Sequence, residues 1–195
     1  LNLEWNFRRV PQANTFSLAA RSGHLRLYAK PEVIENRVQA SLMGFRQRES
    51  DFEYTASIYY QPKKEGEEAG MSLFQKDNNY INFTLTKEQG LMVLKVILKD
   101  PKEEPKILQQ EILSNYEGKI MLRVISKDHQ YQYQYSLDQG RKYITLMSSK
   151  GDLILSHRTG SYTGAYLGLY ATGNGKSTKA FMDVEWVFYQ GFPRS

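Results

Sequence analysis

Apolar and polar residues alternate along most of this chain with a period of two, which is typical of β-strands that have one buried face. The clearest run covers residues 52–60. Its apolar and aromatic side chains all fall on one face of the predicted strand: Phe52, Tyr54, Ala56, Ile58 and Tyr60. The residues between them are mostly polar, so this run predicts a half-buried strand.

Nine further runs predict strands in the same way, whereas the spacing typical of helices is almost absent. They cover residues 71–75, 80–86, 91–98, 107–113, 120–126, 131–137, 143–147, 165–171 and 180–189. Turn-forming residues such as Gln89-Gly90 and Asp138-Gln139-Gly140 separate them. Many short strands without intervening helices predict an all-β fold, namely a two-sheet antiparallel β-sandwich of the jelly-roll type.

The length and composition of the chain favour one domain spanning residues 1–195. Hydrophobic residues make up 41% of the 195 residues, enough for a packed core. No linker, internal repeat or low-complexity tract divides the sequence. Because the chain begins with Leu1 rather than Met, we expect that it derives from a longer precursor.

The net charge of +5 raises the possibility of an acidic partner, but the distribution of charge argues against nucleic acid. Residues 62–68 and 99–106 mix both signs and therefore predict solvated loops. The chain has no Cys, so it cannot form disulfides or thiolate metal sites. It also has no apolar run approaching the ~18 residues of a membrane span.

Two patterns leave alternative functions open. Glu49, Asp51 and Glu53 alternate along the chain and would share one face of a strand, as the carboxylates of a jelly-roll glycosidase do. The polar residues before Asp51 instead favour a charged turn that leads into the strand. In residues 130–135, Gln and Tyr alternate, and the tyrosines are either a sugar-binding surface of a free carbohydrate-binding module or part of the core.

Several segments together resemble one known family, the lectin-like (concanavalin A-like) C-terminal domain of family 43 β-xylosidases and α-L-arabinofuranosidases. The resemblance runs nearly from end to end. The segments that carry it are Leu3-Glu4-Trp5-Asn6-Phe7, Arg21-Ser22-Gly23-His24-Leu25-Arg26-Leu27, Phe45-Arg46-Gln47-Arg48, residues 62–71, residues 162–168 and Ala180-Phe181-Met182-Asp183-Val184-Glu185-Trp186.

The resemblance implies that the chain is an accessory domain without catalytic residues of its own. In this family a β-propeller on the same polypeptide carries the catalytic carboxylates and is the expected partner, and plant polysaccharide is the expected carbohydrate. The resemblance also implies that Tyr162 helps to close the sugar pocket of the propeller. A secreted or periplasmic bacterial location is favoured.

The same resemblance bears on cofactors. No cofactor is expected to be required, but a structural calcium ion occurs in many lectin-like sandwiches and needs several oxygen ligands. Asp183 is the residue from which such a site would be built.

Overall fold

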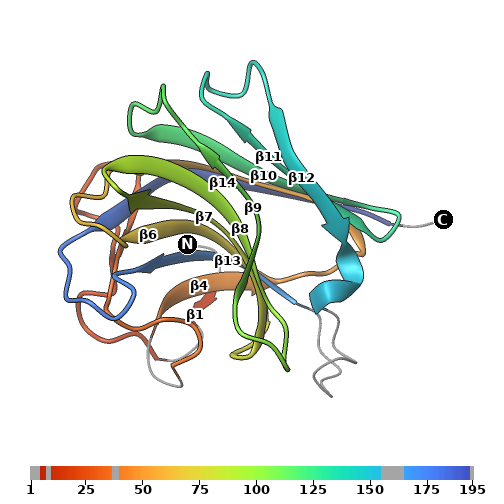
Figure 1. Ribbon diagram of the computed structural model, residues 1–195, viewed down its shortest axis with the longest axis horizontal. Helices are drawn as coiled ribbons and strands as arrows, with labels where there is room; N and C mark the ends of the chain where they lie inside the picture. Colours follow the sequence, from red (N-terminus) through yellow and green to blue (C-terminus); the bar gives the residue numbers. More distant parts are fainter. Residues whose placement is uncertain (1–4, 8–9, 37–39, 155–164, 194–195) are drawn as a thin grey trace.

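The computed structural model describes residues 5–7, 10–36, 40–154 and 165–193, which form two seven-stranded antiparallel sheets packed face to face (Figure 1). The first sheet has the order β1 (Asn6–Phe7), β4 (Ser41–Arg46), β13 (Tyr166–Thr172), β6 (Glu68–Lys76), β7 (Asn79–Glu88), β8 (Leu91–Lys99) and β9 (Lys106–Ile112). The second has the order β12 (Ile144–Lys150), β11 (Gln130–Ser136), β10 (Lys119–Lys127), β5 (Asp51–Tyr60), β14 (Phe181–Phe192), β3 (Leu25–Tyr28) and β2 (Phe16–Ser17). One short 3₁₀ helix, η1 (Gly151–Ile154), follows β12.

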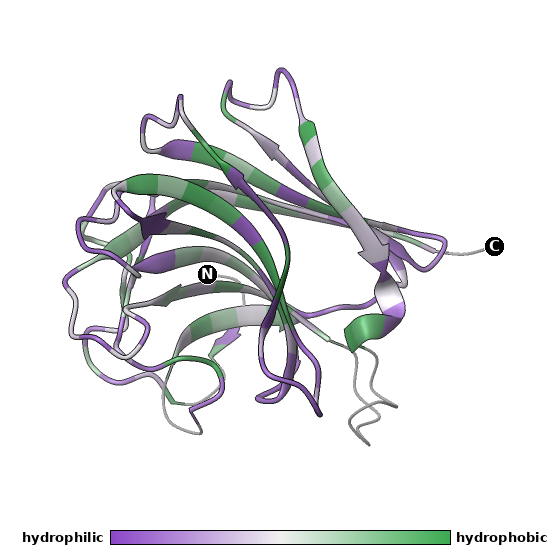
Figure 2. Ribbon diagram, in the orientation of Figure 1, coloured by the Kyte–Doolittle hydropathy of each residue, from purple (hydrophilic) through white to green (hydrophobic). Residues whose placement is uncertain are grey.

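This architecture confirms the predicted all-β sandwich, and each of the ten predicted runs corresponds to one of the strands β5 to β14. Bands of contrasting hydropathy along the strands make the underlying alternation visible (Figure 2). The four strands nearest the N-terminus, β1 to β4, were not predicted. Three of them have only two to four residues, too few to show a period.

The main core lies between the two sheets. In β5, Phe52, Tyr54, Ala56 and Ile58 are fully buried there. The three tyrosines of β11, Tyr131, Tyr133 and Tyr135, also belong to this core and are at most 4% exposed. The tyrosine face of residues 130–135 is therefore core, and it offers no surface for sugar stacking.

A second, smaller apolar cluster covers the face of the first sheet that points away from the second sheet. Ile34, from the connection between β3 and β4, packs there on Leu42, Phe74 and Tyr170. The hydroxyl of Tyr80 also donates a hydrogen bond of 2.7 Å to Glu35 in that connection. The first sheet is therefore buried on both faces over much of its area.

Two tight turns fix the register of neighbouring strands. Gln89 and Gly90, between β7 and β8, both have positive φ angles, 49° and 76°. Asp128 and His129, between β10 and β11, repeat this arrangement with φ angles of 50° and 62°. Two central residues with positive φ are typical of the hairpin turn that matches the twist of the flanking strands.

The outer face of the second sheet carries an exposed aromatic stripe along β14. A bulge between Val184 and Trp186 shifts the register of β14 against β5. Beyond the bulge, Trp186, Phe188 and Phe192 all point outward and are 41–43% exposed. Three large rings on one solvent-facing stripe are more than scattered surface apolar residues, and they indicate a contact surface.

Candidate functional site

A cavity of about 810 Å³ opens at one end of the sandwich, over the outer face of the second sheet. Its floor is formed by strands β3, β5 and β14, which contribute Arg26, Tyr59 and Asp183. Three connections supply the walls: residues 61–67 after β5, residues 117–118 before β10, and residues 177–180 before β14. The volume lies in the range of small-molecule binding cavities.

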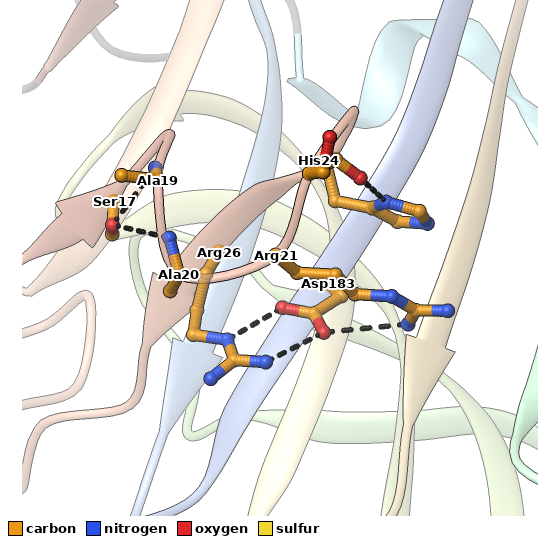
Figure 3. A network of polar contacts seen from close by, with 8 residues as sticks. Ser17, Ala19, Ala20, Arg21, His24, Arg26 and Asp183 are labelled. Atoms are coloured by element: carbon orange, nitrogen blue, oxygen red, sulfur yellow. Dashed lines mark hydrogen bonds and ion pairs between the residues drawn. The ribbon is translucent and has the colours of Figure 1, made fainter.

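Asp183 lies on the floor of this cavity and is bound by two arginines (Figure 3). Arg26 donates two hydrogen bonds to it, from Nε to Oδ1 at 2.8 Å and from Nη2 to Oδ2 at 3.0 Å. Arg21 approaches from the other side, with Nη1 at 3.4 Å from Oδ2. The register of β14 against β3 produces this contact, because Asp183 and Arg26 are directly paired.

The electrostatics of this network keep Asp183 ionised. Burial by itself raises the pKa of the Asp183 carboxyl, but the hydrogen bonds and charges of Arg26 and Arg21 outweigh it and lower the pKa below its ordinary value. The side chain of Asp183 is only 4% exposed, whereas those of Arg26 and Arg21 are 20% and 39% exposed. The network is thus a largely buried carboxylate with its two cations at the cavity surface.

These surroundings do not fit the calcium ion for which Asp183 was the candidate ligand. Both carboxylate oxygens of Asp183 already accept hydrogen bonds from guanidinium groups. Calcium requires six to eight oxygen ligands, and two adjacent cations repel a third. In the described part of the chain, no group of three or more His, Asp or Glu side chains could hold a metal ion.

Aromatic rings hold both guanidinium groups in place. The Cζ atom of Arg26 lies 3.7 Å from the ring centroid of Phe181, and that of Arg21 lies 4.2 Å from the centroid of Tyr59. Lys119 also approaches Tyr59, with Nζ at 4.8 Å from the centroid, and it forms an ion pair of 2.9 Å with Glu185. Stacking on rings restricts the rotamers of long cationic side chains, so these guanidinium groups present fixed edges.

The wall of the cavity is built around the carboxylate of Glu67. Oε2 of Glu67 accepts hydrogen bonds from the backbone amides of Lys63 at 2.8 Å and Lys64 at 3.1 Å, and Oε1 accepts one from the hydroxyl of Thr178 at 2.8 Å. Burial raises the pKa of Glu67, but these hydrogen bonds lower it overall. Glu67 thereby fixes the loop after β5 against the loop before β14, and the cavity keeps its shape.

The three carboxylates of the alternative glycosidase hypothesis each bond to a different neighbour. Glu49 precedes β5 and accepts a hydrogen bond of 2.7 Å from the hydroxyl of Tyr189. Oδ1 of Asp51 accepts a hydrogen bond of 3.2 Å from the backbone amide of Asp128. Glu53 lies 3.8 Å from Nη1 of Arg123 and lines a depression of about 270 Å³ beside Trp186 and Phe188.

Tyr162, the predicted pocket contact, lies outside the described residues. The first described residue after it is Ala165, whose carbonyl accepts a hydrogen bond of 2.8 Å from the backbone amide of Gln47. Ala165 precedes the start of β13, whereas Thr172 at the end of β13 lies near the cavity end of the sandwich. Ala165 and the cavity therefore lie at opposite ends of a strand about 20 Å long.

Sequence reasoning did not find this cavity. The run of residues 62–68 was interpreted as a solvated loop. Its lysines are exposed, but Glu67 and Glu68 are buried, and β6 begins at Glu68. The missing information was the pairing of β3 with β14, which brings together residues 157 positions apart. No helix among the described residues is long and apolar enough to cross a membrane.

The fold and its ligand-sized cavity define a lectin-like β-sandwich domain. Comparison with known families is more specific: the pattern of the β-xylosidase C-terminal concanavalin A-like domain of family 43 glycoside hydrolases matches residues 1–190. The chain belongs to this family. The resemblance noted in the sequence is thus confirmed.

Two relatives are named as an α-L-arabinofuranosidase and a xylosidase/arabinosidase. The chain is 26% identical over 192 residues to the non-reducing end α-L-arabinofuranosidase BoGH43B of Bacteroides ovatus, covering 97% of the chain and 35% of the enzyme. It is 28% identical over 173 residues to a xylosidase/arabinosidase of Butyrivibrio fibrisolvens, covering 88% of the chain and 32% of that protein. The chain therefore spans about a third of the length of these relatives.

Solved structures show the same fold. The Bacteroides ovatus GH43B structure from a xyloglucan locus matches with a TM-score of 0.88 and 24% identity, over 98% of this chain and 37% of that one. The GH43 protein BlXynB of Bacillus licheniformis matches with a TM-score of 0.88 and 23% identity, again over 98% and 37%.

Proposed function

We propose that this chain is a non-catalytic accessory domain of a family 43 glycoside hydrolase that acts on xylan- or arabinan-type polysaccharides. It packs on the catalytic β-propeller domain of the same polypeptide and helps to close its sugar pocket. The observation that carries the proposal is the match of residues 1–190 to a C-terminal domain family, combined with relatives of which the chain covers only 35% and 32%.

The arrangement of carboxylates supports a non-catalytic role. A glycosidase needs two carboxyl groups that face each other across the scissile bond, about 5–10 Å apart. Glu49, Asp51 and Glu53 instead bond to separate neighbours. Asp183, in the large cavity, is held by Arg26 and Arg21 and is not arranged as a proton donor.

The contact with the catalytic domain is proposed for the end of the sandwich where β13 begins. Ala165, the first described residue after Tyr162, lies at this end. Phe192 of the aromatic stripe pairs with Asp51 at this same end. Burying Trp186, Phe188 and Phe192 against the catalytic domain would remove three exposed rings from water, and this favours docking of a large neighbour.

The substitution Tyr162→Ala in the full-length enzyme tests this proposal. If the ring contacts substrate in the transition state, its loss removes about 2 kcal/mol of transition-state stabilisation, and kcat/KM falls roughly thirtyfold. Thermal unfolding should change little. Tyr28→Ala is the matched control, because Tyr28 is also a partly exposed aromatic residue but lies at the end of β3 against Phe181, at the opposite end of the sandwich.

The outcomes separate the possible roles of Tyr162. A ring that merely packs between domains would lower the melting temperature and leave kcat/KM of the folded enzyme near wild type. Unchanged kcat/KM together with unchanged melting would remove Tyr162 from both roles. A loss of kcat/KM as large in Tyr28→Ala would show that the effect is not specific to the proposed pocket.

The alternative function, a free carbohydrate-binding module, makes a different prediction. A domain that completes the pocket of a neighbour does not need to bind neutral sugar by itself. We expect linear xylan and arabinan oligosaccharides to bind the isolated chain with a Kd of about 1 mM or weaker, roughly 4 kcal/mol of binding free energy. Micromolar affinity in calorimetry would favour the free module.

A further inference from the structure

The cavity over β3, β5 and β14 has an excess of positive charge. Five cationic and three anionic residues line it. Two of the three anions already have close donors, since Arg26 and Arg21 bind Asp183 and backbone amides bind Glu67. The third, Glu117, is exposed to solvent. The negative charges of Asp183 and Glu67 are thus largely compensated by donors of the site itself.

Several donors in this cavity remain available. Within the described part of the chain, neither Lys63 nor Lys179 has an acidic group within ion-pair distance of its ammonium nitrogen. Arg21 uses one terminal nitrogen to contact Asp183, and a guanidinium has five N–H donors in total. Lysine and arginine donors around an open cavity bind an anion by charge-assisted hydrogen bonds.

We propose that this cavity binds a saccharide that carries a carboxylate, such as the uronic acid branch of a xylan chain. The carboxylate of the saccharide accepts charge-assisted hydrogen bonds from Lys63, Lys179 and Arg21. The sugar hydroxyls form hydrogen bonds with neutral and acidic side chains that line the cavity, namely Gln61, Ser177 and Glu117.

The size and lining of the cavity favour a saccharide over a bare inorganic anion. A volume of about 810 Å³ accommodates several sugar rings, whereas phosphate would fill only a small part of it. Side chains that donate hydrogen bonds and side chains that accept them both line the cavity beside the cations. Such a mixture matches sugar hydroxyls, each of which both donates and accepts a hydrogen bond.

The position of the cavity makes it a secondary site. It lies at the end of the sandwich opposite to the start of β13, where the contact with the catalytic domain is proposed. A polysaccharide bound there would be retained on the enzyme without entering the catalytic pocket. The choice of a xylan branch rests on the proposed function, but binding of a uronate saccharide by the chain does not require the catalytic domain.

The test is an NMR titration of the ¹⁵N-labelled 195-residue chain with four probes. They are xylotriose bearing one glucuronic acid branch, linear xylotriose, free glucuronic acid and inorganic phosphate. The branched probe should bind at least about tenfold more tightly than linear xylotriose, with shifts at Gly118 and Thr178. Raising the ionic strength about tenfold should weaken this binding, because solvent-exposed charges are screened.

Two charge-matched double variants locate the site. Lys63→Gln with Lys179→Gln removes two cations from the cavity and should weaken binding of the branched probe about tenfold or more. Lys106→Gln with Lys127→Gln removes the same charge from the ends of β9 and β10, outside the cavity, and should leave binding nearly unchanged. Both pairs are on the surface, so both variants should fold.

Three results would overturn the proposal. One is equal affinity for branched and linear xylotriose, and another is an equal loss of affinity in the two double variants. The third is phosphate binding as tightly as the branched probe at the same residues, which would show a general anion site. None of these results would affect the Tyr162 experiment, so failure of this inference and failure of the proposed function remain distinguishable.

Discussion

The phenolic hydroxyl of Tyr54 donates a hydrogen bond of 2.9 Å to the backbone carbonyl of Gly168, and this bond links the two sheets through the core. Tyr54 comes from the central strand β5 of the second sheet, and Gly168 from β13 of the first. This buried polar contact adds a directional link to the apolar packing between the sheets.

We predict that Tyr54→Phe destabilises the fold by about 1 kcal/mol, because it leaves a buried carbonyl with one partner fewer. The melting temperature should fall by about 3 °C for a domain of this size. Tyr131→Phe is the matched control: Tyr131 is 4% exposed, and its hydroxyl has no hydrogen-bond partner in the described part of the chain. Equal melting of the two variants would show that the inter-sheet bond contributes nothing.

The Arg26–Asp183 pair makes the stability of the fold depend on pH. Because the folded state lowers the pKa of Asp183, the stabilisation is fully present above the unfolded-state pKa of about 4 and is lost as the pH falls through the folded-state pKa. Asp183→Asn should cost about 2 kcal/mol at neutral pH, since it leaves Arg26 without its carboxylate. In acid, the difference between variant and wild type should shrink.

Chemical denaturation between neutral and acid pH measures this effect. Glu185→Gln is the control, because the Lys119–Glu185 pair is more exposed and should contribute less than about 1 kcal/mol. If the two variants gave the same loss at neutral pH, the network around Asp183 would have no special role in stability.

Glu68 should show the opposite pH dependence. It is 6% exposed, and burial raises the pKa of its carboxyl despite hydrogen bonds from Thr84 and Asn174. A raised folded-state pKa means that the unfolded chain loses this proton first, so the contribution of Glu68 to stability declines as the pH rises above about 4. Glu68→Gln should therefore stabilise the fold at neutral pH, on the order of 1 kcal/mol.

Denaturation of Glu68→Gln at neutral and acid pH, in parallel with Asp183→Asn, gives the comparison. The advantage of Glu68→Gln over wild type should disappear below the unfolded-state pKa, where both chains carry an uncharged side chain. A variant less stable than wild type at every pH would show that the hydrogen bonds to Thr84 and Asn174 require the carboxylate.

The fold was predictable where one face of a strand is apolar and the other polar, as in β5. Strand β4 shows where this signal fails. Its residues Ser41 to Phe45 are all buried, because Met43 and Phe45 face the main core while Leu42 packs in the smaller cluster on the other face. A strand buried on both faces has no alternation to detect.

The candidate cavity was not predictable for a different reason. Each of its parts is an ordinary surface feature in the sequence, and the site exists only because β3 pairs with β14. That pairing sets Arg26 opposite Asp183, although 157 positions separate them. Hydrophobic periodicity identifies the faces of strands, but it carries no information about which strands are neighbours.

Catalysis provides the last prediction. We expect the 195-residue chain to release no sugar from aryl xylosides, aryl arabinofuranosides or β-glucans, because its candidate carboxylates are bound to separate groups. Glu49 accepts a hydrogen bond from Tyr189, and Glu53 pairs with Arg123. Each is thus engaged where a glycosidase would need one carboxyl group as acid and another as nucleophile or base. The measurement is release of chromophore or reducing sugar at high protein concentration, with Glu49→Gln and Glu53→Gln assayed alongside. Turnover above the blank that vanished in either variant would show that these carboxylates belong to an active site, and the jelly-roll glycosidase would then replace the accessory domain as the function of this chain.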